Sequence, residues 1–133
     1  MAVQLSTTVR NARLNSIETT IGTSAVVKIF TGSPPANCAA ADSGTMLATL
    51  SLPSDYFNAA SSGSMTKLGT WTVASASNTG TAGYFRMYDS TAATCHVQGT
   101  VGTSGADMIV NTTSVVSGQS FTINTFTLTD ANA

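Results

Sequence analysis

The chain opens with a hydrophobic pattern of helical period. Apolar side chains recur at spacings of three and four residues, which places them on one stripe of a helix: Leu14, Ile17 and Ile21. Ser6 suits the cap before the first turn, and Gly22 suits the position after the last turn, where a left-handed backbone is favoured. We therefore predict a helix over residues 6–21. Its single apolar stripe indicates that the helix docks on a surface, either the sheet of its own chain or a neighbouring protein.

After Gly22 the hydrophobic period changes to two, which is typical of strands. Short runs rich in β-branched and aromatic residues are separated by Gly, Pro, Asn and Ser. These runs predict strands at residues 25–31, 45–52, 67–74, 84–89, 95–101, 106–111, 114–116 and 120–129. Short strands with such turns favour a mainly β fold: a jelly-roll-like antiparallel β-sandwich over residues 25–129 with one N-terminal α-helix. The length fits a single domain over residues 1–133.

The last predicted strand contains a break in its alternation. Phe121 and Ile123 share one face of the strand, whereas Phe126 and Leu128 fall on the opposite parity. If all four side chains reach one core, a β-bulge near Asn124–Thr125 must shift the register. If the strand has no bulge, both of its faces are covered.

The shortage of charge excludes several classes of partner. Charged side chains make up 8% of the chain, against about 25% in a typical soluble protein. The five basic residues are too few to neutralise a phosphate backbone, so we expect no nucleic-acid partner. No run of about 18 apolar residues and no basic amphipathic stretch occurs, so we expect no membrane partner either. No apolar segment follows a basic start at the N-terminus, and we therefore expect a protein made in the cytoplasm.

The residue types that carry catalysis or bind metals are few and scattered. His96 is the only histidine, and its neighbour Cys95 points to the opposite face of a strand, so the two do not form a metal site. No Gly-x-Ser-x-Gly elbow occurs, and the carboxylates have no pair at short spacing: Glu18, Asp42, Asp55, Asp89, Asp107 and Asp130. We predict a protein that is not an enzyme, with no catalytic residue, metal or cofactor. A cytoplasmic origin favours free thiols for Cys38 and Cys95, and a disulfide between them is the alternative.

Two groups of residues are candidates for contact with another protein. Tyr84, Arg86 and Tyr88 share the strand face opposite Phe85 and Met87, and Tyr and Arg are favoured at interface hot spots. The alternative for this stripe is a half-exposed outer face of the sheet. The second group lies on the predicted helix: Arg10, Arg13, Leu14 and Ile17. Ser and Thr make up roughly 30% of the chain, and hydroxyl groups are covered by a partner without the desolvation cost of ions.

Several stretches resemble small virion proteins of tailed bacteriophages. They are LSTTVRNARL at 5–14, IETTIG at 17–22, DSGTMLA at 42–48, GTAGYFRMYD at 80–89 and GQSFTINTFTLT at 118–129. Among characterised phage proteins of this size, the chain is most similar to the jelly-roll cementing, or decoration, proteins of capsid exteriors. Those families carry no catalytic residues, so the resemblance implies a structural role.

The resemblance leads us to expect a structural protein that binds the outside of a phage capsid. There it would cement neighbouring copies of the major capsid protein, on the capsid surface of the virion, after synthesis in the host cytoplasm. We expect it to act as a homo-oligomer, a dimer or a trimer. Two alternatives stay open: a tail, baseplate or fibre-associated structural module, and a carbohydrate-binding β-sandwich, for which the chain is poor in aromatic residues, at 7%.

Overall fold

The computed structural model describes residues 3–131 and confirms the mainly β fold with one N-terminal helix. The helix is α1 (Thr7–Ile21). The strands are β1 (Val26–Thr31), β2 (Met46–Ser51), β3 (Ser64–Thr66), β4 (Trp71–Val73), β5 (Gly80–Tyr88), β6 (Cys95–Gly102), β7 (Met108–Val110), β8 (Ser114–Val115) and β9 (Phe121–Thr129). The sequence predicts one strand over 67–74, whereas the structure places two short strands, β3 and β4, around this region.

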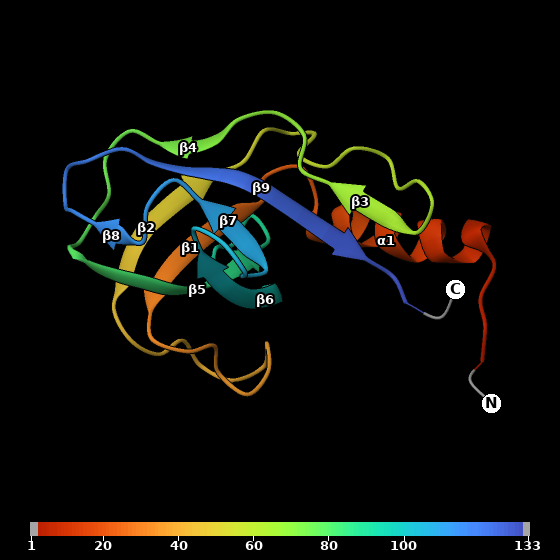
Figure 1. Cartoon of the computed structure of the whole chain (residues 1–133), viewed down its shortest axis with the longest axis horizontal. Helices are drawn as coiled ribbons and strands as arrows, with labels where there is room; N and C mark the ends of the chain where they lie inside the picture. Colours follow the sequence, from red (N-terminus) through yellow and green to blue (C-terminus); the bar gives the residue numbers. More distant parts are fainter. Residues whose placement is uncertain (1–2, 132–133) are drawn as a thin grey trace.

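The strands form one curled sheet in the order β2-β1-β5-β6-β7-β9-β3. β4 also pairs with β9, and β8 pairs with β5. The pairs are antiparallel except that β6 and β7 run parallel, with Val101 beside Met108. Figure 1 shows β9 crossing over the layer made by β2, β1, β5 and β6. The sheet therefore curls into a β-sandwich of jelly-roll-like character, with one parallel pair where a fully antiparallel sheet is expected.

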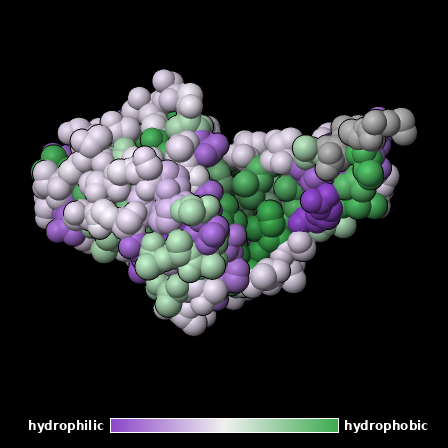
Figure 2. Space-filling view, turned by 90° about the horizontal axis from the view of Figure 1, so that it is seen from below, coloured by the Kyte–Doolittle hydropathy of each residue, from purple (hydrophilic) through white to green (hydrophobic). Residues whose placement is uncertain are grey.

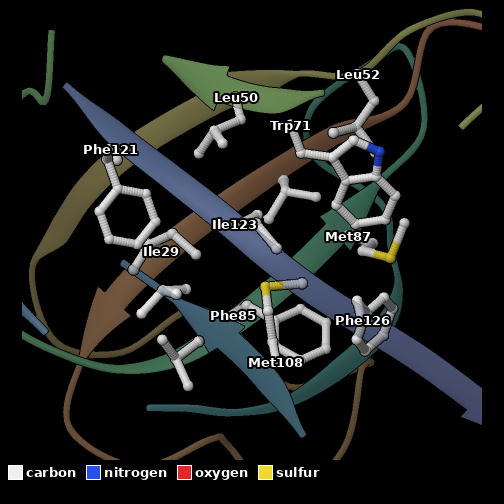
Figure 3. Close-up of a cluster of buried hydrophobic side chains, with 14 of the residues drawn as sticks. Ile29, Leu50, Leu52, Trp71, Phe85, Met87, Met108, Phe121, Ile123 and Phe126 are labelled. Carbon is white, nitrogen blue, oxygen red and sulfur yellow. The ribbon is translucent and has the colours of Figure 1, made fainter. Parts of the chain in front are cut away.

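Apolar side chains fill the space inside the curl. Figure 3 shows Phe85 and Met108 between Ile29 of β1 and Phe126 of β9. Phe85 meets Phe126 edge to face, with ring centroids 5.1 Å apart. Trp71 is fully buried, and its indole N–H donates to a backbone carbonyl at 3.1 Å, so its polar atom is satisfied. Burial of each such side chain contributes about 2–3 kcal/mol, which makes this core the main source of stability.

β9 contains the bulge that its broken alternation predicts. The register along β7 skips Asn124, because Ile109 pairs with Thr125 and the next residue, Val110, pairs with Ile123. The bulge shifts the parity of the strand. Buried side chains therefore lie on both sides of it: Phe121, Ile123 and Phe126.

Part of the chain projects from the rest of the molecule (Figure 1). We call α1, β3 and residues 127–130 the arm, and the remaining strands the body. The helix of the arm begins as predicted, since the Ser6 hydroxyl accepts a hydrogen bond from the Val9 amide at 3.2 Å. It ends at Gly22, whose φ of 89° lies in the region that favours glycine.

Residues 33–44, which connect β1 to β2, form an irregular segment that we call the strap. In Figure 1 it is the orange loop below the sheet. The Tyr84 hydroxyl of β5 donates to the Ser43 carbonyl at 2.6 Å. The Gln98 amide of β6 donates to the Pro35 carbonyl at 2.7 Å. The strap is thus fastened across the face of β5 and β6 that points away from the core.

Candidate interaction surface

The apolar stripe of α1 packs within its own chain, on the main apolar cluster and beside β3. Leu14 and Ile21 are each 4% exposed, and both belong to the main apolar cluster. Ile17 packs against the same cluster but stays partly exposed. The sequence alone did not show whether this stripe packs on its own chain or on a neighbouring protein. In the structure it packs on its own chain. Leu14 is consequently almost fully covered, and only a small part of its side chain reaches the surface.

A second, polar stripe of α1 fastens the helix along its length. Side-chain oxygens spaced by four and three residues accept hydrogen bonds from three amides of the facing segment: Asn11 from Gly63 at 2.9 Å, Asn15 from Ala60 at 2.9 Å and Glu18 from Phe57 at 2.7 Å. Each neutral bond contributes about 1 kcal/mol. Sequence reasoning missed this stripe, because Asn and Glu on a helix ordinarily face water. Their regular spacing is the one signal that could have revealed it.

Arg10 and Arg13 both reach Asp130, which follows β9. The Arg13 Nε lies 3.1 Å from the Asp130 carboxylate, and Arg10 donates to the Asp130 carbonyl at 3.3 Å. The Arg10 guanidinium lies so close to Gly63 that a Cβ there would collide with it, and Gly63 has a φ of 76°. The Arg13 side chain is 55% exposed, whereas that of Asp130 is 8% exposed. Arg13 therefore keeps a charged surface that another molecule could contact.

A pocket of about 340 Å³ opens between α1 and the end of β9, and we call it the notch. Its lining consists of Arg13, Leu14, Ile17, Thr129, Asp130 and Ala131. Figure 2 shows apolar surface gathered in the hollow between the body and the arm. Apolar and polar residues line the notch together, a combination that suits an apolar side chain of a protein partner flanked by polar contacts. Three of the predicted contact residues, Arg13, Leu14 and Ile17, meet here.

The other three predicted contact residues lie elsewhere and are not exposed. Tyr84, Arg86 and Tyr88 are 0%, 2% and 1% exposed, respectively, because the strap covers them. The expectation that this stripe of β5 forms an exposed interface is wrong, and so is the alternative of a half-exposed sheet face. The strap has no hydrophobic periodicity, and the alternation of β5 does not indicate that another segment covers this face.

Arg86 is the centre of a closed polar network under the strap. Its guanidinium donates to the Asp42 carboxylate at 2.7 Å, to the Asn37 carbonyl at 2.9 Å and to the Gln98 side chain at 3.0 Å. The Tyr88 hydroxyl donates to the same Asp42 oxygen at 2.6 Å. Burial, and then the bond to Asp42, raise the pKa of Tyr88. The network therefore holds a neutral phenol and a paired charge, and it fastens the strap rather than presenting a reactive group.

A second pocket, of about 430 Å³, brings together Glu18 and Asp55, which the sequence separates widely. Burial, and then the neighbouring charge of Asp55, raise the pKa of Glu18, against the lowering effect of the Phe57 amide. Two carboxylates in one pocket are the minimum for acid–base chemistry. Here, however, Glu18 is already committed to the Phe57 amide as part of the polar stripe of the helix.

Within residues 3–131, no group of three or more His, Cys, Asp or Glu side chains could hold a metal ion. The one helix of this part of the chain is not long and apolar enough to cross a membrane. Comparison of the chain with protein-family models, with curated proteins and with solved structures found no match.

Proposed function

We propose that the protein is a non-catalytic structural component of a phage virion, which binds the outside of the capsid and cements neighbouring copies of the major capsid protein. The observation that carries this proposal is the arm with its notch. A body that projects an arm beside an apolar hollow (Figure 2) fits against the raised edge of another protein. The choice of a phage capsid as that protein comes from the resemblance of stretches such as residues 5–14 and 80–89 to virion proteins.

The chemistry of the surface supports a role in assembly. With 8% charged residues, a partner covers this surface without the cost of stripping water from many ions. Three large apolar side chains are exposed among the described residues: Val3 at 77%, Val9 at 45% and Val116 at 39%. Val9 lies on α1 and Val3 just before it, so two of the three lie at the arm.

Contact through the notch is weak for a single copy and becomes strong when it is repeated. One apolar side chain in a pocket contributes about 1.5–3 kcal/mol. A dimer or trimer that engages several capsid subunits at once multiplies the affinity through effective concentration. We therefore include a homo-oligomeric form in the proposal.

The proposal is tested by co-sedimentation of the purified protein with capsids assembled from the major capsid protein encoded in the same genome. Ile17→Asp and Arg13→Ala should each weaken binding at least tenfold, because they alter an apolar and a polar residue that line the notch. Val116→Asp is the matched control: it places the same charge on an exposed apolar position of the body, and it should bind as the parent does. Far-ultraviolet circular dichroism checks that each variant folds. If all three variants bind the capsid equally well, the notch is not the docking site.

The number of copies in purified virions separates the capsid from other locations. Quantitative mass spectrometry should find hundreds of copies per particle, and electron microscopy should place them on the capsid exterior. A handful of copies, located at the tail or baseplate, would replace the proposal with a tail-associated role.

A further inference from the structure

The structure brings the two cysteines of the chain together. Cys38 lies in the strap, and Cys95 is the first residue of β6. Both side chains are half-buried, both are in the thiol form, and both line one surface pocket together with Ala39, Ala93 and Thr94. The Cys95 thiol donates to the Val97 carbonyl at 3.5 Å, and the neighbouring Cys38 thiol contributes to raising the pKa of Cys95. A disulfide between Cys38 and Cys95 would close a loop of roughly 60 residues, and folding has already brought the two ends of this loop together.

The backbone around Cys38 is fixed on both sides by bonds already present. The Asn37 carbonyl accepts from Arg86 at 2.9 Å, and the Asn37 side chain accepts from the amides of Ala39 and Ala40, each at 3.0 Å. On the other strand, Cys95 pairs in register with Tyr88. The thiols are thus positioned by the polar network under the strap and do not meet by chance motion of a loose loop.

We propose that Cys38 and Cys95 form an intramolecular disulfide when the protein meets a small-molecule disulfide such as oxidised glutathione, and that this bond locks the strap onto β6. This inference does not depend on the proposed capsid role.

The exchange proceeds in two steps. The Cys38 thiolate attacks one sulfur of the small disulfide, which forms a mixed disulfide and releases one thiolate. The Cys95 sulfur then loses its proton to solvent and attacks the Cys38 sulfur, which forms the protein disulfide and releases the second thiolate. The two electrons lost by the protein reduce one small disulfide to two thiols.

Cys38 is the attacking thiol because it lies in the irregular strap, whereas Cys95 is held in β6 beside Tyr88 and donates to the Val97 carbonyl at 3.5 Å. Burial, and then the neighbouring Cys38 thiol, raise the pKa of Cys95 to about 12, so Cys95 stays protonated at neutral pH. Arg86 acts on Cys95 in the opposite direction, and Asp42 acts in the same direction as burial. Once Cys38 is in the mixed disulfide, its thiol no longer raises the pKa of Cys95, although burial, the larger cause, still does. Cys95 is the other cysteine of the chain and therefore acts as the resolving residue.

The full chain is incubated with oxidised glutathione and then analysed by intact-mass spectrometry and by peptide mapping without reduction. We expect a loss of two hydrogens and a single peptide that joins Cys38 to Cys95. We also expect the Tm to rise by roughly 10 °C and to return after treatment with dithiothreitol. Two stable glutathione adducts, or covalent dimers on a non-reducing gel, would overturn the proposal.

Single-cysteine variants distinguish attack from resolution. Cys95→Ser should accumulate one stable glutathione adduct at Cys38, whereas Cys38→Ser should react at least tenfold more slowly. If Cys38→Ser reacts as fast as Cys95→Ser, the assigned order is wrong.

Hydrogen exchange measures the effect on the strap independently of folding yield. The Ser43 amide, which donates to the Tyr84 hydroxyl, should exchange at least tenfold more slowly in the oxidised protein than in the reduced one. An unchanged rate would show that the bond does not lock the strap.

Discussion

The two faces of β5 are both buried, but by different means. On the inner face, Phe85 and Met87 meet other apolar side chains inside the curl of the sheet. On the outer face, Arg86 and its tyrosine neighbours meet the strap, and hydrogen bonds rather than apolar contacts hold that segment in place. One strand thus faces a packed core on one side and a closed polar network on the other.

The two faces should differ in how much stability a substitution costs. An apolar core loses stability in proportion to the volume removed from it, and its neighbours relax in part. A buried polar network loses more than the bond that is deleted wherever water cannot reach the partners left behind. The outer face of β5 should therefore be sensitive to the kind of atom replaced, and the inner face to its size.

The largest effect is expected on the inner face. Phe85→Ala removes a fully buried ring that packs on Phe126 and should lower the free energy of unfolding by about 3–5 kcal/mol. Urea denaturation followed by Trp71 fluorescence measures this change. Phe85→Leu fills most of the same volume and should cost clearly less. If both variants lose the same amount, volume does not govern this face.

A smaller effect is expected on the outer face. Arg86→Met keeps most of the volume but removes the guanidinium that donates to Asp42, Gln98 and the Asn37 carbonyl. Asp42 keeps only its bond from the Tyr88 hydroxyl. The Asp42 side chain is 41% exposed, and water replaces part of the lost bond, so we expect a cost of about 2 kcal/mol. Arg86→Lys keeps the charge without the planar fork and should recover less than half of this loss in urea denaturation. Full recovery by Lys would mean that charge alone holds the strap.

The smallest effect is expected at Tyr88 and depends on pH. Tyr88→Phe removes the bond to Asp42 and should cost about 1 kcal/mol at neutral pH. The folded pKa of Tyr88 is raised above the ordinary value of 10.0, so the folded state keeps this proton where the unfolded state loses it. The stabilisation from Tyr88 is therefore complete below pH 10 and is lost as the pH rises toward the folded value.

Urea denaturation of the parent and of Tyr88→Phe across the alkaline range measures this dependence. The difference in the free energy of unfolding between the parent and Tyr88→Phe should become smaller above pH 10. A difference that stays constant would mean that Tyr88 titrates in the folded protein as it does in the unfolded chain.

Much of the fold follows from local pattern. The helix over residues 6–21 has its stripe, its cap and its terminal glycine in the sequence, and the structure places α1 within one residue of these bounds. The alternation of Phe121 and Ile123 against Phe126 predicts the bulge at Asn124. These features depend on neighbours a few residues apart, which is the range over which a hydrophobic period carries information.

The candidate site could be predicted only in part, because distant residues complete it. Arg13 and Ile17 follow from the helix, but the notch exists only because β9 ends beside them. The face of Arg86 follows from the alternation of β5, but its partner Asp42 lies 44 residues away in a segment without a period. Burial by an irregular segment leaves no trace in the alternation of the strand it covers.

The bulged strand β9 has a mechanical consequence. It pairs with β7 and β4 in the body and with β3 in the arm, so one continuous strand joins the two parts. Hydrogen bonds of an antiparallel pair run perpendicular to the strands. A pull on the arm along β9 therefore loads these bonds together in shear, whereas a sideways pull would open them one after another. The arm can bear tension along this direction without first separating from the body.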